Sequence, residues 1–169
     1  MSLFPFKKDH NHTISRPKAG SSPSASPLMY QGNDFTIHRP EGWRDTTIYT
    51  LAGPVEDGIQ HTILIMADHN ASFESVAEYA EVQINALVDQ LQGCRLLKQG
   101  HISLDSGVPA YQAIFNWCPT EQTLLYQQQV FVLQGKTGYK LTATFTRKTR
   151  KTLGPTVERI LMSFNPTAA

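Results

Sequence analysis

The sequence predicts an α+β fold, in which an antiparallel β-sheet is flanked by one long helix and a shorter C-terminal helix. Three observations predict it. Short segments with strand-forming or alternating residues are separated by turn residues, which is typical of antiparallel strands. Residues 73–91 have apolar residues at helical spacing, and residues 156–164 repeat that spacing over a shorter length.

The length of 169 residues predicts one domain, which follows an N-terminal tail. Residues 18–27 are small, polar and proline-containing, and such a run cannot bury enough surface to offset its conformational entropy. We expect residues 1–28 to form a flexible tail and residues 29–169 a single domain. The tail lacks the apolar run of a secretory signal, so we expect a cytoplasmic protein.

The first strands are predicted at residues 28–30 and 35–37, joined by a turn of Gly, Asn and Asp. Residues 46–51 are rich in Thr, Ile and Tyr and predict another strand, and Gly53-Pro54 predicts a loop. Residues 59–67 predict a further strand. This strand is apolar on both faces at residues 63–66, so we expect it to be central and covered on both sides.

The long helix is predicted over residues 73–91, with Ser72 as the N-cap and Gly93 at the end. Gln83 borders the apolar side of this helix, and Tyr79 falls on its polar side. The apolar arc holds the following residues: Phe73, Val76, Ala77, Ala80, Ile84, Leu87, Val88 and Leu91.

The second half predicts a meander of strands at residues 95–104, 110–117, 122–133 and 139–146, closed by a helix over 156–164. Alternation in the last strand places a set of polar residues on one face: Lys140, Thr142, Thr144 and Thr146. Gln129 interrupts one face of the strand before it, which also carries Leu125, Gln127, Phe131 and Leu133.

The composition excludes several classes of protein. Charged residues make up 17% of the chain, against a typical quarter, while it holds 12 Gln and 16 Thr and has a net charge of +1. We therefore expect no nucleic-acid partner. Without eighteen consecutive apolar residues, we expect no stable membrane insertion. The segment 147–151 holds four basic residues and is interpreted as a solvated helix start or, alternatively, as a phosphate or partner contact.

The sequence contains no common catalytic motif, so we predict no catalytic residues, no metal and no cofactor. Cys94 and Cys118 are expected to be free thiols. Two interpretations of Gln83 and Gln129 stay open. They satisfy backbone groups or face solvent, or they supply neutral hydrogen-bonding groups to an apolar groove that receives a small-residue helix.

Several segments together resemble the DcrB-like family, and within it the Eag chaperones of the bacterial type VI secretion system. The resemblance covers about residues 29–165 and is carried by residues 35–45 (Phe-Thr-Ile-His-Arg-Pro-Glu-Gly-Trp-Arg-Asp), Ile48, the strand end Met66-Ala67-Asp68, the helix 73–93 and the strand 126–131. It implies a Mog1/PsbP-like fold and a cytoplasmic homodimer. It further implies that the dimer binds the N-terminal transmembrane helices of PAAR- or Rhs-type effectors before export.

By position in the family, the paired glutamines that contact client helices match Gln83 and Gln129. The candidate client-binding residues are Gln83, Gln129, Ile48, Ile65, Tyr79 and Phe131, with Leu64 or Met66 as the alternative apolar face of the strand 59–67. The resemblance does not extend to the 28-residue tail. Two other hypotheses remain: a Mog1-like adaptor or regulator without a transmembrane client, and an enzyme that uses Cys94 or a histidine.

Overall fold

The computed structural model describes residues 28–32, 34–43 and 45–167. The predicted tail, apart from Leu28, therefore lies outside the described residues. Contacts divide the chain between residues 44 and 45 into two units, which we describe separately. None of the helices in the described ranges is long and apolar enough to span a bilayer.

The first unit holds a β-hairpin of β1 (Leu28–Gln31) and β2 (Thr36–Arg39), which pair antiparallel. At its turn the Gly32 amide donates to the Phe35 carbonyl at 2.9 Å, and the Tyr30 and Phe35 rings lie 6.1 Å apart. The predicted strand, turn and strand are thus confirmed.

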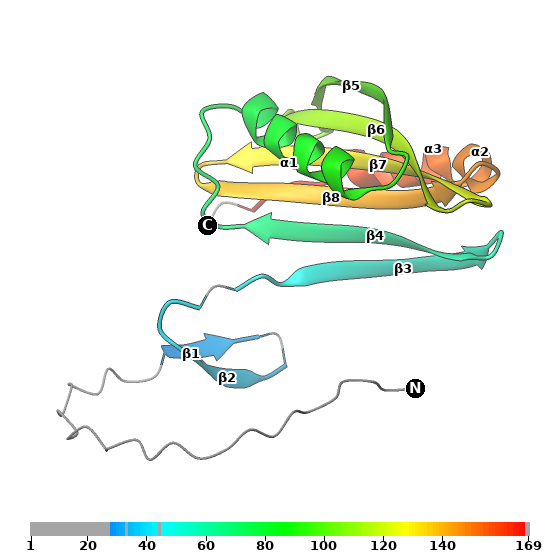
Figure 1. The fold of residues 1–169 in the computed structure, drawn as a ribbon. Coiled ribbons are helices and arrows are strands. Elements are labelled where there is room, and N and C mark those ends of the chain that lie inside the picture. Colours follow the sequence, from blue (N-terminus) through cyan, green and yellow to red (C-terminus); the bar gives the residue numbers. More distant parts are fainter. Residues whose placement is uncertain (1–27, 33, 44, 168–169) are drawn as a thin grey trace, which may run out of the picture. The chain divides into compact units, whose positions relative to one another are not determined.

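The second unit is built on one antiparallel sheet of six strands in the order β3-β4-β8-β7-β6-β5 (Figure 1). The predicted meander forms β5 to β8, and β4 joins it beside β8. The strands are β3 (Ile48–Glu56), β4 (Ile59–Asp68), β5 (Arg95–Ser103), β6 (Pro109–Thr120), β7 (Thr123–Gln134) and β8 (Thr137–Thr146). The α+β prediction is confirmed.

Three helices accompany the sheet: α1 (Val76–Gln90), α2 (Thr149–Thr152) and α3 (Gly154–Met162). The long helix begins later than predicted, because Ser75 rather than Ser72 caps it and accepts a hydrogen bond from the Glu78 amide at 3.1 Å. Gly93 follows the helix with a φ of +64°, which suits its predicted role at the helix end.

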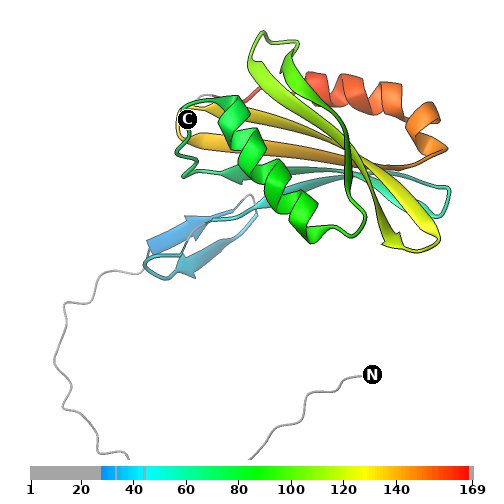
Figure 2. The same ribbon diagram turned by 45° about the horizontal axis from the view of Figure 1, so that its top comes forward.

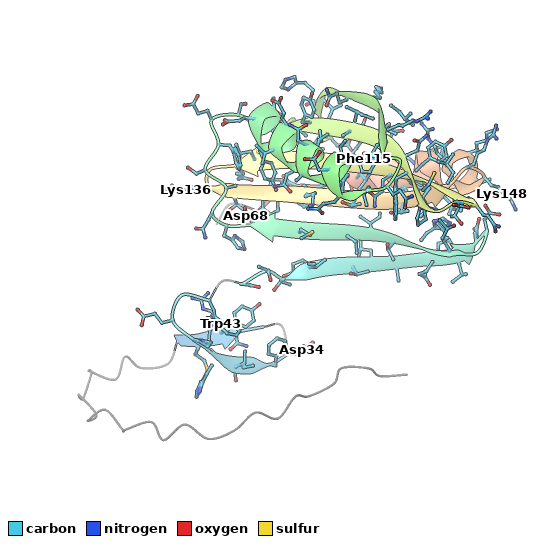
Figure 3. All side chains as sticks on the ribbon, viewed as in Figure 1. Asp34, Trp43, Asp68, Phe115, Lys136 and Lys148 are labelled. Atoms are coloured by element: carbon cyan, nitrogen blue, oxygen red, sulfur yellow. The ribbon has the colours of Figure 1, made fainter. Side chains whose placement is uncertain are left out.

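The two longer helices lie on opposite faces of the sheet (Figure 2). One core lies under α1 and contains Ala71, Tyr79, Ala80, Ile84, Ala113, Phe115 and Phe131. The other core includes Leu161 of α3 and contains Ile63, Leu104, Ala110, Val130, Val132, Leu141, Ala143 and Phe145. Phe115, marked in Figure 3, belongs to the α1 core.

Besides the start of the long helix, three other predictions from the sequence were wrong. Residues 53 and 54 do not form a loop, because β3 continues through them with a register shift between Ala52 and Val55, as edge strands permit at proline. β4 is not covered on both sides: Ile63 is 7% exposed, but Leu64 on the other face is only half-buried. Tyr79 is 2% exposed, because it turns under α1 onto Phe131.

Tyr79 also explains a glycine in β8. A Cβ atom on Gly138 would lie 2.6 Å from Cζ of Tyr79, so only glycine allows the ring to pack this closely against the strand. We predict that Gly138→Ala lowers the free energy of unfolding by about 1–3 kcal/mol, as overpacking does. Urea denaturation followed by circular dichroism measures the change.

The matched control is Gly100→Ala in β5, where an added Cβ meets no atom within 4 Å. This variant should unfold at the same urea concentration as the parent or slightly above it. Equal losses for the two variants would contradict the packing of Tyr79 on Gly138.

Candidate binding face

One face of the sheet is only partly covered by its helix. α1 packs mainly on β5, β6 and β7. An α-helix is about 10 Å wide and strands are about 4.8 Å apart, so one helix covers two or three strands. The face of β3, β4 and most of β8 on the α1 side of the sheet therefore has no helix over it among the described residues, and we call it the open face.

The open face is apolar along β3 and β4. Ile48 pairs with Met66 and Thr50 with Leu64, so these four side chains lie on one side of the sheet. Ile48 is 50% exposed, while Leu64 and Met66 are half-buried. Exposed apolar side chains that adjoin one another are typical of a binding surface.

Very little charge interrupts this side of the sheet. By register, its charged side chains are Lys140 of β8 and Asp68 at the end of β4. Figure 3 shows Asp68 at the same end of the sheet as Lys136 and far from Lys148. The rest of the open face carries threonine and aliphatic side chains and Gln60 at the beginning of β4, which suits a partner without charge.

Two glutamines of β7 border the open face. Gln127 donates to Thr144 Oγ1 at 3.2 Å, and Gln129 donates to Thr142 Oγ1 at 3.3 Å. The Oε1 atom of each glutamine is buried and has no hydrogen-bond partner among the described residues. Trp117 Nε1 on the same side of the sheet is also buried and unpartnered. A buried polar group without a partner costs about 1–3 kcal/mol.

Gln83 reaches the open face from α1. Its Oε1 atom accepts a hydrogen bond of 3.4 Å from the ammonium group of Lys140. Burial lowers the pKa of Lys140, because desolvation disfavours the charged form. The two predicted glutamines, Gln83 and Gln129, thus approach β8 from the helix and from the neighbouring strand respectively.

The other predicted site residues do not lie together on the open face. Ile48 lies on the open face, but Ile65 pairs with Tyr49 and packs on the α3 side, so Leu64 and Met66 are the residues that share the face of Ile48. Tyr79 and Phe131 are both almost fully buried, with ring centroids 6.1 Å apart in an edge-to-face arrangement. They hold α1 on the sheet and present no surface to a partner.

The opposite side of the sheet has a competing apolar site. A hollow of about 220 Å³ lies between α3 and the hairpin of β3 and β4. Its lining includes Leu51, Ile63, Phe145, Val157 and Ile160. Leu51 is 52% exposed and Ile160 is 43% exposed, so its rim is accessible.

Among the described residues, no cluster of three or more His, Cys, Asp or Glu side chains fits a metal ion. Cys94 and Cys118 are free, as predicted. Burial raises the pKa of the Cys94 thiol, which lowers its thiolate fraction. The basic segment 147–151 is mostly exposed and contains the start of α2, and Arg150 lies 4.8 Å from the centre of the Tyr126 ring.

Sequence reasoning missed Lys140 and the two threonines as members of the site. The alternation of β8 already placed Lys140, Thr142 and Thr144 on one face. What the sequence lacked was the register, which sets these residues opposite Phe131, Gln129 and Gln127.

Comparison with known proteins agrees with the fold. PA94, a protein of unknown function from Pseudomonas aeruginosa, is 21% identical with a TM-score of 0.67, and the match covers 85% of this chain and 99% of that one. LpqN, which is involved in cell envelope biogenesis of Mycobacterium tuberculosis, is 16% identical with a TM-score of 0.47, and the match covers 66% of each chain. The cyanobacterial PsbP of Synechocystis is 10% identical with a TM-score of 0.49, and the match covers 89% of this chain and 98% of that one.

No curated protein matches the sequence of the chain. The family model named DcrB matches residues 35–163, which extends from the first hairpin to α3. Because this match covers most of the sequence, the protein belongs to the DcrB family.

Proposed function

We propose that this DcrB-family protein is a cytoplasmic chaperone that shields the N-terminal transmembrane helices of type VI secretion effectors of the PAAR or Rhs type. The observation that carries the proposal is the open face, an apolar surface beside α1 bordered by the amides of Gln83, Gln127 and Gln129. The resemblance to the Eag chaperones supplies the class of client.

The energetics support such a client. Apolar surface costs about 25 cal/mol per Å² in water, so a transmembrane helix is strongly unfavourable outside a membrane. A helix lying over the open face would bury its own surface together with Ile48, Leu64 and Met66. This binding needs no nucleotide or catalytic step, because release requires only a more favourable environment such as a bilayer.

The glutamines suit small-residue membrane helices, whose Ser and Thr hydroxyl groups are hydrogen-bond donors and acceptors. The unpartnered Oε1 atoms of Gln127 and Gln129 can accept from such hydroxyl groups. Gln129 is only 3% exposed, so its amide must turn outward to reach a client. It would then give up its hydrogen bond to Thr142 for one to the client helix. A neutral amide performs this role without the desolvation cost of a charge.

A second copy of the chain completes the proposal. β3 is an edge strand whose nine residues are all exposed, and its first half, residues 48–52, is uncharged. Edge strands of this kind readily pair with another chain. Antiparallel pairing about Thr50 would set Ile48 opposite Ala52 and Tyr49 opposite Leu51, which joins two open faces into one surface.

A Mog1-like adaptor is the second candidate function. The apolar hollow between α3 and the hairpin of β3 and β4 favours it, since the accessible side chains of Leu51 and Ile160 suit docking of a folded partner. This function would leave the open face unused, and it needs no transmembrane client.

We predict that co-expression with the transmembrane region of a PAAR or Rhs effector keeps that region soluble, and that Gln83→Ala and Gln129→Ala weaken the complex. Each loses a hydrogen bond, which is worth about 0.5–1.5 kcal/mol and therefore about 2- to 13-fold in Kd. Affinity of the purified proteins for a labelled client segment measures the effect.

The matched controls are Gln128→Ala, which alters the other face of β7, and Gln90→Ala at the exposed end of α1. Both should bind like the parent. An effector segment that stays insoluble with the parent protein would refute the chaperone function. Equal affinities for all four variants would refute only the role of the glutamines.

We further predict that Thr50→Lys and Thr50→Glu each yield monomers, because like charges would face one another across the two-fold axis. An equimolar mixture of the two variants should restore the dimer through opposite charges. Light scattering after size-exclusion chromatography measures the masses. A parent that is monomeric, or single variants that remain dimeric, would show that β3 does not pair with itself.

A further inference from the structure

Lys140 is a charged residue at the border of the open face, on β8 beside α1. It lies near the beginning of β8, between Met66 of β4 and Phe131 of β7, and is half-buried. Its neighbours along the face are Gly138 and Thr142. The side chains next to Lys140 on this face are all uncharged, so its positive charge stands alone among them.

The ammonium group of Lys140 is poorly satisfied by the protein. It has three donors, but its side chain makes a single hydrogen bond to a described residue, to Gln83 Oε1 at 3.4 Å. The acid on the same face is Asp68, whose carboxylate accepts instead from the Asn70 amide at 3.0 Å. Tyr79, the titratable group that faces this region from α1, has its pKa raised to about 12 by burial and by Asp68, so it supplies no anion.

Desolvation supports the same conclusion. Burial lowers the pKa of Lys140, which means that the charged form costs free energy where it stands. A half-buried cation without a counter-ion is unfavourable for the protein alone. Two donors that have no acceptor among the described residues, at the border of a binding face, therefore point to acceptors that arrive with the bound partner.

The acceptors that an uncharged helix carries are at its C-terminus. Its last four carbonyl groups lack partners within the helix, and the helix dipole places about half a negative charge there. We infer that Lys140 binds the C-terminal carbonyl groups of the helix that occupies the open face, and so fixes the direction of that helix. The inference rests on the proposed function, since it requires a helix on this face.

The expected arrangement is specific. The C-terminal end of the bound helix lies at Lys140 beside Gln83, and its N-terminal end lies toward the far end of β8. A helix in the opposite direction would place its positive end against the ammonium group and would be disfavoured.

The test uses the full chain and a synthetic apolar helix of about twenty residues rich in Ala, Leu and Ser, with a nitroxide label at either end. With the parent protein, the C-terminal label should broaden the amide resonances of Met66 and Gln83, and the N-terminal label should leave them sharp. Lys140→Met should bind about two- to five-fold more weakly and lose this difference between the labels.

Two control variants isolate the charge. Lys140→Arg keeps the cation and should keep the parent pattern, and Lys136→Met removes an exposed lysine of the neighbouring turn and should behave like the parent. The melting temperature of Lys140→Met without peptide should equal or exceed that of the parent. A lower value would show that Lys140 stabilises the fold rather than a partner.

The outcomes separate the two proposals. If the parent binds the peptide and Lys140→Met keeps its direction and affinity, the role of Lys140 is overturned while the binding face stands. If the parent binds no apolar helix, both are overturned.

Discussion

A sheet of six strands is wider than the single helix that covers one of its faces, and the rest of the structure follows from this mismatch. α1 is held over β5, β6 and β7 by a tight core in which Tyr79 packs on Phe131 and on Gly138. The helix cannot also cover β8, β4 and β3. An apolar strip along β3 and β4 consequently stays open beside α1.

The polar groups along that strip make fewer hydrogen bonds than their donors and acceptors allow. Among the described residues, Gln127 and Gln129 each make one hydrogen bond to a threonine of β8 and leave an oxygen without a partner, and the Lys140 ammonium group bonds only to Gln83. A stability-optimised face would replace these groups with aliphatic residues. Their presence costs stability in the isolated chain and is consistent with a surface whose hydrogen bonds are completed by a partner.

The fold was largely predictable from the sequence because its signals are local. The alternation in residues 139–146 and the helical spacing in residues 73–91 each depend only on which side of a single strand or helix is buried. The site was less predictable because it depends on register. Only pairing shows that Ile48 shares a face with Met66 rather than Ile65, or that Thr142 lies opposite Gln129. Tyr79 was misplaced because the apolar arc ignores how far an aromatic ring reaches around a helix.

Methyl NMR of protein labelled at Ile, Leu, Val and Met, titrated with an apolar helical peptide, tests the central claim most directly. The account predicts that the methyl resonances of Ile48, Leu64 and Met66 shift, because these residues form the open face. Shifts confined to Leu51, Val157 and Ile160 would place the peptide in the hollow beside α3 and would contradict the account.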